Sequence, residues 1–170
     1  RIISDFEKGK TQILIGTQML SKGLDFGNVS VVGILSADSL MNFPDFRAHE
    51  RAYQLMVQVS GRAGRRDKRG TVILQTTQPE HPLIRMVQHF AYKEMVSLQL
   101  SERSMFRYPP YYRLIVLILR SRNEEALQEM SALYAEKLRA RLGERVLGPV
   151  TPPITRVQTL HIKKIVLKIE

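Results

Sequence analysis

The sequence predicts an α/β protein in which part of a parallel sheet is followed by a small α+β domain. Two observations predict the first part. Short apolar runs occur at 12–15, 29–35 and 71–76, and a helical repeat that ends near Ser60 lies between the second and third runs. A separate observation predicts the second part. After a segment rich in proline and tyrosine, one aliphatic run is followed by a long helical repeat and two further apolar runs.

The strands of the first part follow from short apolar segments with turn residues beside them. Residues 4–8 are typical of the last turn of a helix, and the apolar run at 12–15 predicts a buried parallel strand. The run at 29–35 predicts a second strand. Gly70 then opens a third strand at 71–76.

A loop and a helix are expected between the second and third strands. Asn42, Pro44 and Asp45 are turn formers, so 36–46 is expected to be a loop. The helix begins at Asp45 or Phe46 and ends near Ser60. Its apolar residues recur every three or four positions, as in a helix with one buried face. They are Ala52, Leu55, Met56 and Val59.

Two proline-rich segments divide the rest of the chain. Pro79 and Pro82 bracket a turn, after which 83–100 has the apolar content of a helix. The second segment, 108–112, is the expected domain boundary; its aromatic rings either stack on nucleic-acid bases or pack against a domain interface. The expected domains are 1–80, a helical connector at 81–107, and an α+β domain at 108–170.

The α+β domain is expected to have the order strand, helix, strand, strand. Its first strand is 114–119. Asn123 is a suitable N-cap for a helix that carries two glutamates in its first turn and ends at Gly143. After a rigid turn at 150–153 come strands at 157–159 and 162–169, so we expect a ferredoxin-like or similar sandwich. No closing helix precedes Glu170, which leaves open that this domain is incomplete.

Composition narrows the class of protein. The 170 residues are 44% hydrophobic, so a core is expected, and there is no apolar run of about 18 residues, so no membrane span is expected. The absence of cysteine excludes disulfides and thiolate metal sites from this chain. The sequence opens without a methionine, and we interpret it as a fragment of a longer protein.

The positive charge is concentrated in the second half. Net charge is +10, and residues 81–170 hold 15 Lys/Arg and 8 Asp/Glu, which gives +7. A basic surface favours a polyanion such as DNA through counterion release. The alternative is a basic protein whose charge serves only solubility.

The segment 58–65, with the sequence QVSGRAGR, is the most informative part of the chain. It sets Arg62 and Arg65 beside two glycines and behind Gln58, at the end of a predicted helix. Guanidinium groups are always charged and bind phosphate oxygens in a fork, so the pair suits phosphoryl transfer. Alternatively, the glycines only cap the helix and the arginines only complement its dipole.

A second segment, 13–26 (ILIGTQMLSKGLDF), passes from an apolar run into a polar loop. The loop carries a hydroxyl, an amide, an amine and a carboxylate, from Thr17, Gln18, Lys22 and Asp25. Such groups after a strand are typical of a site at the carboxyl edge of an α/β sheet. The alternative is an ordinary strand followed by a solvated turn.

Taken in order, the two segments resemble motifs V and VI of superfamily 2 helicases. Three further features resemble the primosomal protein N′ (PriA) family, the bacterial replication-restart DNA helicases. These are the sequence GTQM-x-x-KG, the run DFRAHER at 45–51, and VLGPV at 146–150 followed by Pro152 and Pro153. The resemblance covers nearly the whole chain and implies that 1–80 is the C-terminal part of a RecA-like helicase lobe 2.

The resemblance also implies roles for the motif residues. Arg62 and Arg65 would reach the γ-phosphate of ATP across the cleft between two lobes, and Arg65 is the preferred arginine finger. Gln58 would couple the nucleotide to the lobes. Gly23, Asp25 and Gly61 match nucleotide-binding positions, while Thr17, Gln18 and Lys22 match positions that face the DNA.

Cofactors and partners follow from the same resemblance. ATP with Mg²⁺ would be bound mainly by a first lobe, whose G-x-x-x-x-G-K-[ST] loop and DEAH-type quartet are not in this sequence. The isolated chain is therefore expected not to hydrolyse ATP. The family's zinc insert would lie upstream of Arg1, and no metal is expected in this chain. Expected partners are single-stranded and branched DNA and the replication-restart and single-strand-binding proteins, in the bacterial cytoplasm at the nucleoid.

Several residues have weaker signals. Asp38 follows the second strand and is either a site residue or a solvated carboxylate. Arg47, Glu50 and Arg51 have the spacing of a helical ion-pair network. The four histidines are scattered and suggest no metal site.

Two alternatives to this helicase family remain. The first is a nucleic-acid-binding module without enzymatic activity, whose helicase segment is a relic. The second is another DNA-stimulated translocase of the same superfamily, against which the VLGPV-x-PP segment argues.

Overall fold

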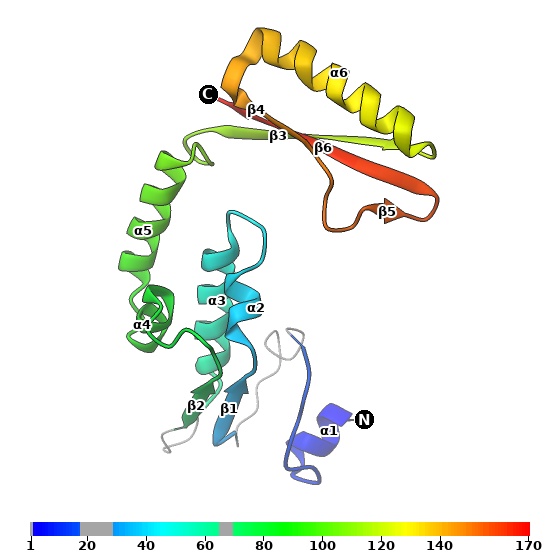
Figure 1. Ribbon diagram of the computed structural model, residues 1–170. Helices are drawn as coiled ribbons and strands as arrows, with labels where there is room; N and C mark the ends of the chain where they lie inside the picture. The colour runs from blue at the N-terminus through cyan, green and yellow to red at the C-terminus, as the bar shows by residue number, and fades with distance from the viewer. Residues whose placement is uncertain (1, 18–28, 65–69) are drawn as a thin grey trace. The chain divides into compact units, whose positions relative to one another are not determined.

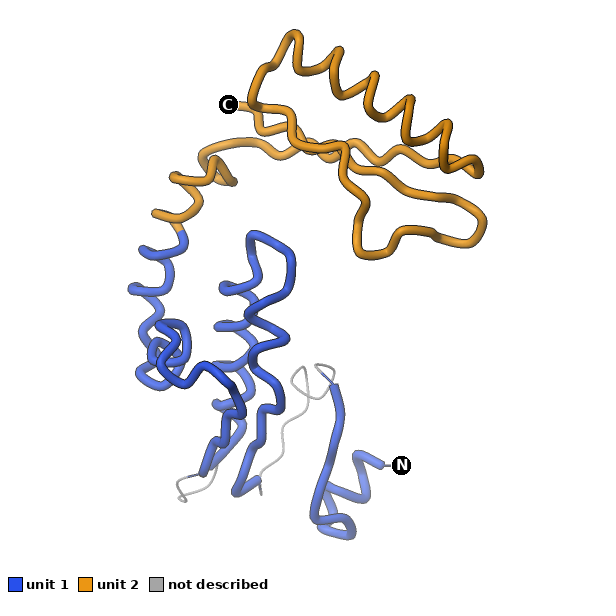
Figure 2. Tube along the Cα trace, viewed as in Figure 1, with its two compact units in different colours: residues 1–99 blue, residues 100–170 orange. Residues whose placement is uncertain are grey.

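The computed structural model describes residues 2–17, 29–64 and 70–170. It has two compact units, Arg1–Gln99 and Leu100–Glu170 (Figure 2). Both combine helices with strands, which confirms the predicted α/β class (Figure 1). Within the described ranges, no helix is both long enough and apolar enough to cross a bilayer.

Unit 1 is organised around a pair of parallel strands. Strand β1 (Val31–Ile34) pairs with β2 (Thr71–Leu74) in the register Val31↔Thr71 to Ile34↔Leu74. Helices α2 (Ala37–Met41) and α3 (Ala48–Ser60) lie between them in the sequence. This is the crossover that parallel pairing requires, since a tight turn cannot return the chain to the same end of a sheet.

The core of unit 1 lies between the strands and the helices. Helix α3 contributes Ala52, Tyr53 and Met56, which are at most 3% exposed, in agreement with the predicted apolar face. Helices α4 (Pro82–Gln88) and α5 (Tyr92–Met105) supply further buried residues. The predicted connector at 81–107 therefore begins with residues that pack into this core; the three-part domain scheme itself stays a prediction.

The buried strand predicted at 12–15 was wrong. After α1 (Ile2–Glu7) the chain has no regular structure through Thr17, and Ile13 and Ile15 are 78% and 84% exposed. An apolar run becomes a strand only where a neighbouring strand edge pairs with its backbone. The described ladders of unit 1 join only β1 and β2.

The loop predicted at 36–46 contains helix α2. Ser36 takes a left-handed conformation (φ 54°) and turns the chain out of β1. Ala37 and Met41, four residues apart, are then buried against the core. Burial of one face stabilises this short helix although turn-forming residues follow it. The loop is therefore confined to the residues after Met41.

The single helix predicted at 83–100 is two helices. Phe90 adopts φ 52°, which ends α4, and the Ala91 N–H donates to the Met86 carbonyl at 2.8 Å. Helix α5 then begins at Tyr92. Both helices bury apolar residues, so their composition did not reveal the break.

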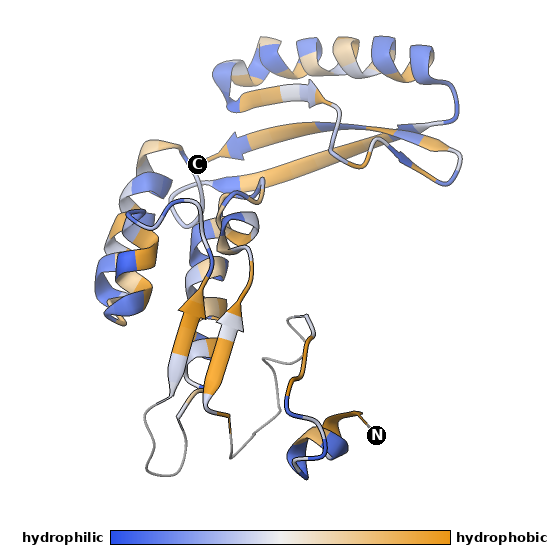
Figure 3. Cartoon of the chain, turned by 60° about the horizontal axis from the view of Figure 1, so that its bottom comes forward, coloured by the Kyte–Doolittle hydropathy of each residue, from blue (hydrophilic) through white to orange (hydrophobic). Residues whose placement is uncertain are grey.

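Unit 2 is an antiparallel sheet with one long helix on it. Strand β6 (Leu160–Ile169) lies between β3 (Arg113–Ser121) and β4 (Val146–Val150), and the short β5 (Arg156–Val157) pairs with its start. Helix α6 (Glu124–Leu142) packs on the face that carries Leu117, Ile165 and Leu167 (Figure 3). The predicted order of strand, helix, strand, strand is found in β3, α6, β5 and β6, but the prediction missed β4, which lies before the turn expected at 150–153.

The ends of α6 are as the sequence predicts. The Ala126 N–H donates to Asn123 Oδ1 at 3.0 Å, which caps the first turn. Gly143 has φ 58° and ends the helix. A short 3₁₀ turn, Gly143–Arg145, then leads into β4.

Lys168 joins the end of α5 to the sheet of unit 2. Its Nζ donates to the Phe106 carbonyl at 2.5 Å and lies 3.9 Å from the centre of the Tyr108 ring. Burial, and to a smaller extent the nearby Arg107, lowers the pKa of this lysine. Tyr108 thus contacts Lys168 within unit 2, and the two expected uses of the 108–112 aromatics stay predictions.

Met56→Ala should destabilise unit 1, because Met56 is fully buried at the centre of α3. Truncating a buried methionine leaves a cavity and typically costs about 2–5 kcal/mol of unfolding free energy. Chemical denaturation followed by circular dichroism measures the change. The matched control is Met130→Ala, because Met130 is 62% exposed on α6. Equal effects of the two substitutions would contradict the assigned core.

Candidate functional site

The end of helix α3 presents the first of the two motif segments. Gln58 is exposed on its last turn. The backbone then continues in a tight turn: the Gly61 N–H donates to the Val57 carbonyl at 3.0 Å and the Arg62 N–H to the Val59 carbonyl at 3.0 Å. We call Gly61–Gly64 the arginine loop. Its start is thus fixed by the helix.

The other end of the arginine loop is fixed to the sheet. Gly64 has φ 85°, which favours glycine, and its N–H donates to the Val29 carbonyl at 3.2 Å. Val29 lies two residues before β1, so the loop sits at the amino-terminal end of the parallel pair (Figure 1). Val29 also comes three residues after Phe26, the end of the second motif segment. The fold therefore brings the arginine loop against the residues that follow that segment.

Gly70 is a feature of this site that the sequence did not reveal as special. A Cβ added at Gly70 would overlap the Gly64 nitrogen and the Ala63 carbonyl carbon, and would come within 2.6 Å of the Ala63 Cβ. The start of β2 and the arginine loop are thus in backbone contact. The sequence showed only a glycine before a strand, because the contact depends on the path of the loop.

The chemistry available here is that of a positioned cation. Arg62 is half-buried, which restrains its side chain, while the surrounding turn contains only small residues. A guanidinium held in this way stabilises negative charge on a phosphoryl group more effectively than one on a mobile side chain, because little entropy is lost on binding. The arginine loop can therefore serve as an anion-stabilising element.

Comparison with known proteins identifies two family models. The model described as "Helicase conserved C-terminal domain" matches residues 1–67, and the model "Primosomal protein N C-terminal domain" matches residues 104–170. The chain is 42% identical to the replication restart protein PriA of Bacillus subtilis, over 99% of the chain and 21% of that protein. It is 39% identical to the PriA of Synechocystis sp., over 98% of the chain and 20% of the relative.

This chain belongs to the PriA family. The PriA of Treponema pallidum is a further relative, 37% identical over 98% of the chain and 26% of its own length. The chain thus spans about a fifth to a quarter of the curated relatives it matches. The arginine loop lies within the helicase match, and the primosomal match covers unit 2 from residue 104 on, which confirms the resemblance inferred from the motifs.

The structure describes four of the predicted site residues. Gln58, Gly61 and Arg62 lie together at the end of α3, and Thr17 is exposed in a segment without regular structure. The others lie outside the described residues. They are Gln18, Lys22, Gly23, Asp25 and Arg65. In this member of the PriA family, the assignment of each residue to catalysis, nucleotide or DNA stays a prediction.

Asp38 acts within the fold at the opposite, carboxyl-terminal end of the strands. Its carboxylate accepts hydrogen bonds from Thr76 Oγ1 at 2.5 Å, from the Thr77 N–H at 2.8 Å and from Thr77 Oγ1 at 2.9 Å. These bonds, that of Thr76 first, lower the pKa of the carboxyl below its ordinary 3.8. Asp38 therefore ties α2 to the segment after β2.

The start of α3 carries one ion pair of the expected helical spacing and a second that was not expected. Arg47 lies 4.0 Å from Glu50, and Arg51 donates to Asp45 at 2.9 Å. Asp45 also accepts from the Arg47 N–H at 2.9 Å, which holds the chain at the entry to the helix. This network stands at the far end of α3 from the arginine loop.

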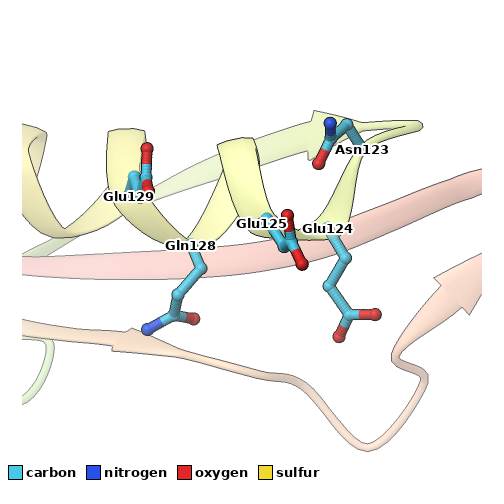
Figure 4. Close-up of a pocket in the computed structure, with 5 residues that line it drawn as sticks. All are labelled: Asn123, Glu124, Glu125, Gln128 and Glu129. Carbon is cyan, nitrogen blue, oxygen red and sulfur yellow. The ribbon is translucent and has the colours of Figure 1, made fainter.

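A shallow pocket at the start of α6 is acidic. It is lined by Asn123, Glu124, Glu125, Gln128 and Glu129 (Figure 4). Glu124 also lies 3.4 Å from His161 Nδ1 on β6. Glutamates repel phosphate, so this pocket does not suit a nucleotide. Over the described parts of the chain, no group of three or more histidine and acidic side chains is placed to hold a metal ion.

Asp38→Ala should make the chain less stable at neutral pH, because Thr76 and Thr77 lose their acceptor. Folding lowers the pKa of Asp38, so the stability that its ionised carboxylate supplies is complete above pH 3.8. This stability is lost as the pH falls through the lower pKa of the folded state. Thermal unfolding of the unmutated and Asp38→Ala proteins between neutral pH and about pH 3 measures the gap, which is the difference between their Tm values. Glu136→Ala is the control, because Glu136 is an exposed carboxylate. A gap that stays constant over this range would contradict the assignment.

Proposed function

We propose that this chain forms the second motor lobe and the C-terminal domain of an ATP-dependent DNA helicase that acts in replication restart at stalled forks. The observation that carries the proposal is the arginine loop. It is fixed at both ends within the region that matches a helicase domain. The name of the relatives, replication restart protein PriA, supports a role in this process.

In the proposed mechanism the arginines stabilise the charge that develops on the γ-phosphate of ATP bound between two lobes. The end of α3 and the bond from Gly64 to Val29 support this role for Arg62. Arg65 follows three residues later in the sequence. Electrostatic stabilisation by pre-positioned donors is the main catalytic contribution available in phosphoryl transfer. Gln58, on the last turn of α3, would respond to the same nucleotide and couple it to lobe movement.

The rest of the ATP site would be supplied by other parts of the protein. Mg²⁺ would neutralise charge on the β- and γ-phosphates when it is bound with ATP. This sequence holds no phosphate-binding loop of the G-x-x-x-x-G-K-[ST] type. We therefore propose that hydrolysis needs a first lobe, and that the isolated chain is inactive.

The open face of unit 1 supports incorporation into a larger sheet. Val31 and Ile73, on neighbouring strands of the parallel pair, are 54% and 59% exposed. Parallel sheets are normally covered on both faces, because their strands are apolar on both sides. Further strands and helices of a RecA-like lobe would cover this surface.

The proposed DNA contacts come from both parts of the chain. Thr17, Gln18 and Lys22 would contact the strand along which the motor moves. The net charge of +7 in residues 81–170 supports binding of single-stranded and branched DNA by the second half. The replication-restart and single-strand-binding proteins are the proposed protein partners. The same charge would suit a nucleic-acid-binding module without activity, which is the second candidate.

Arg62→Ala should remove DNA-stimulated ATP hydrolysis from the complete protein. Loss of an arginine finger typically lowers turnover by about 10³-fold or more. Steady-state hydrolysis with and without forked DNA measures the effect, and DNA affinity should be retained. Arg85→Ala is the matched control, because Arg85 is an exposed arginine of the same unit that pairs with Glu80.

The outcomes separate the two candidates. Near-normal turnover in Arg62→Ala would contradict the proposed role of the arginine loop. An unmutated protein that binds DNA but shows no turnover would support the binding module.

DNA binding by this chain should weaken steeply with salt, because cations of residues 81–170 would release counterions from DNA phosphates. With about three phosphate contacts, the affinity should fall at least tenfold between about 50 and 200 mM salt. Fluorescence anisotropy with a single-stranded oligonucleotide measures this. Affinity that is the same at both salt concentrations would contradict the electrostatic mode.

A further inference from the structure

We propose that Gly70 is a positioning residue for Arg62. Because it has no Cβ, the start of β2 can lie directly against the arginine loop, and this contact sets where Arg62 stands. The inference rests on the proposed function, since it assigns Gly70 to the same site. Gly70 lies outside the QVSGRAGR segment, and only the fold brings it there.

The contact at Gly70 leaves no room for a side chain. An added Cβ would overlap two backbone atoms, the Gly64 nitrogen and the Ala63 carbonyl carbon. It would also stand 2.6 Å from the Ala63 Cβ. None of these atoms is the end of a flexible side chain that can turn away, so one of the two backbones must move.

The backbone of β2 is the less movable of the two. The Thr71 N–H, next to Gly70, donates to the Ser30 carbonyl at 2.9 Å, and the parallel ladder starts at the pair Val31↔Thr71. On the other side, Gly64 is held by one bond to Val29 at 3.2 Å. Displacing the strand breaks several ladder bonds, whereas displacing the 63–64 end of the loop breaks the bond from Gly64 to Val29 and the bond from the Ala63 N–H to the Ser60 carbonyl within the turn. A side chain at position 70 therefore displaces the arginine loop.

Displacement of the loop acts on Arg62, which lies only two residues before Gly64. A catalytic group misplaced by about 1 Å can lose about 100-fold in rate. If Arg62 interacts with charge that develops only in the transition state, the loss falls on kcat and leaves KM nearly unchanged. A general loss of structure would instead weaken DNA binding as well.

Gly33 offers a matched control for the same chemical change. It lies in β1, in register with Ile73 of β2, and a Cβ added there would meet nothing within 4 Å. Gly33→Ala thus introduces a methyl group into the same strand pair without touching the arginine loop. Other elements would cover this face in the complete protein, so the comparison uses kcat: a loss of kcat in Gly70→Ala that is absent from Gly33→Ala reports the contact with the arginine loop.

The experiment compares Gly70→Ala, Gly33→Ala, Arg62→Ala and the double variant Gly70→Ala/Arg62→Ala in the complete protein. DNA-stimulated hydrolysis gives kcat and the KM for ATP, and anisotropy gives the affinity for single-stranded DNA. In Gly70→Ala, kcat should fall by about tenfold or more. KM and DNA affinity should stay within about twofold, and Gly70→Ala should add no loss in the Arg62→Ala background, because coupled residues are non-additive. Gly33→Ala should match the unmutated protein.

Ala63→Val serves as a second variant in case Gly70→Ala does not fold. It adds bulk to the same contact from the loop side, outside every helix and strand. It should lower kcat in the same way.

Three outcomes overturn an assignment, and they are distinguishable. If Arg62→Ala itself leaves turnover intact, the proposed function fails. If Arg62→Ala abolishes turnover but Gly70→Ala and Ala63→Val behave like Gly33→Ala, only the role of Gly70 fails. Losses that multiply in the double variant would also reject a role that acts through Arg62.

Discussion

The parallel pairing of β1 with β2 is the constraint on which the rest of unit 1 depends. The paired residues Val31 and Thr71 are 40 positions apart in the sequence, so the pairing forces the intervening chain to cross over one face of the strands. Helix α3 makes the return crossing and buries Met56 against that face. Its carboxyl-terminal end must then arrive at the amino-terminal end of β1 and β2, where the arginine loop lies.

Different contacts hold the crossover segment at the two ends of the strand pair. At the carboxyl-terminal end, Asp38 joins α2 to the residues after β2 through three hydrogen bonds and has a structural role. At the amino-terminal end, Gly64 binds Val29 and is in backbone contact with Gly70. Close backbone packing at this second end holds the turn that carries Arg62. Such a site suits a ligand that brings its own negative charge.

Much of this could be predicted from local sequence, and the rest depends on distant contacts. The cap at Asn123 and the apolar face of α3 follow local rules, and both were confirmed. The run at 12–15 looked like a strand, but its partner lies outside its own sequence, and Ile13 is exposed. Phe90 broke a predicted helix through a left-handed backbone that composition does not encode. At the site, the arginines were evident from their motif. The contact of Gly70 could not be predicted, because it depends on the path of the arginine loop in the fold.

The most direct test of the account is a structure of the complete protein bound to Mg²⁺ and an ATP transition-state analogue. The account predicts the Arg62 guanidinium within hydrogen-bonding distance of the group that mimics the γ-phosphate. It also predicts that the Gly64 N–H still donates to the Val29 carbonyl and that Gly70 still lies against the loop. A closed, nucleotide-bound structure in which Arg62 points away from the phosphates would contradict the central claim.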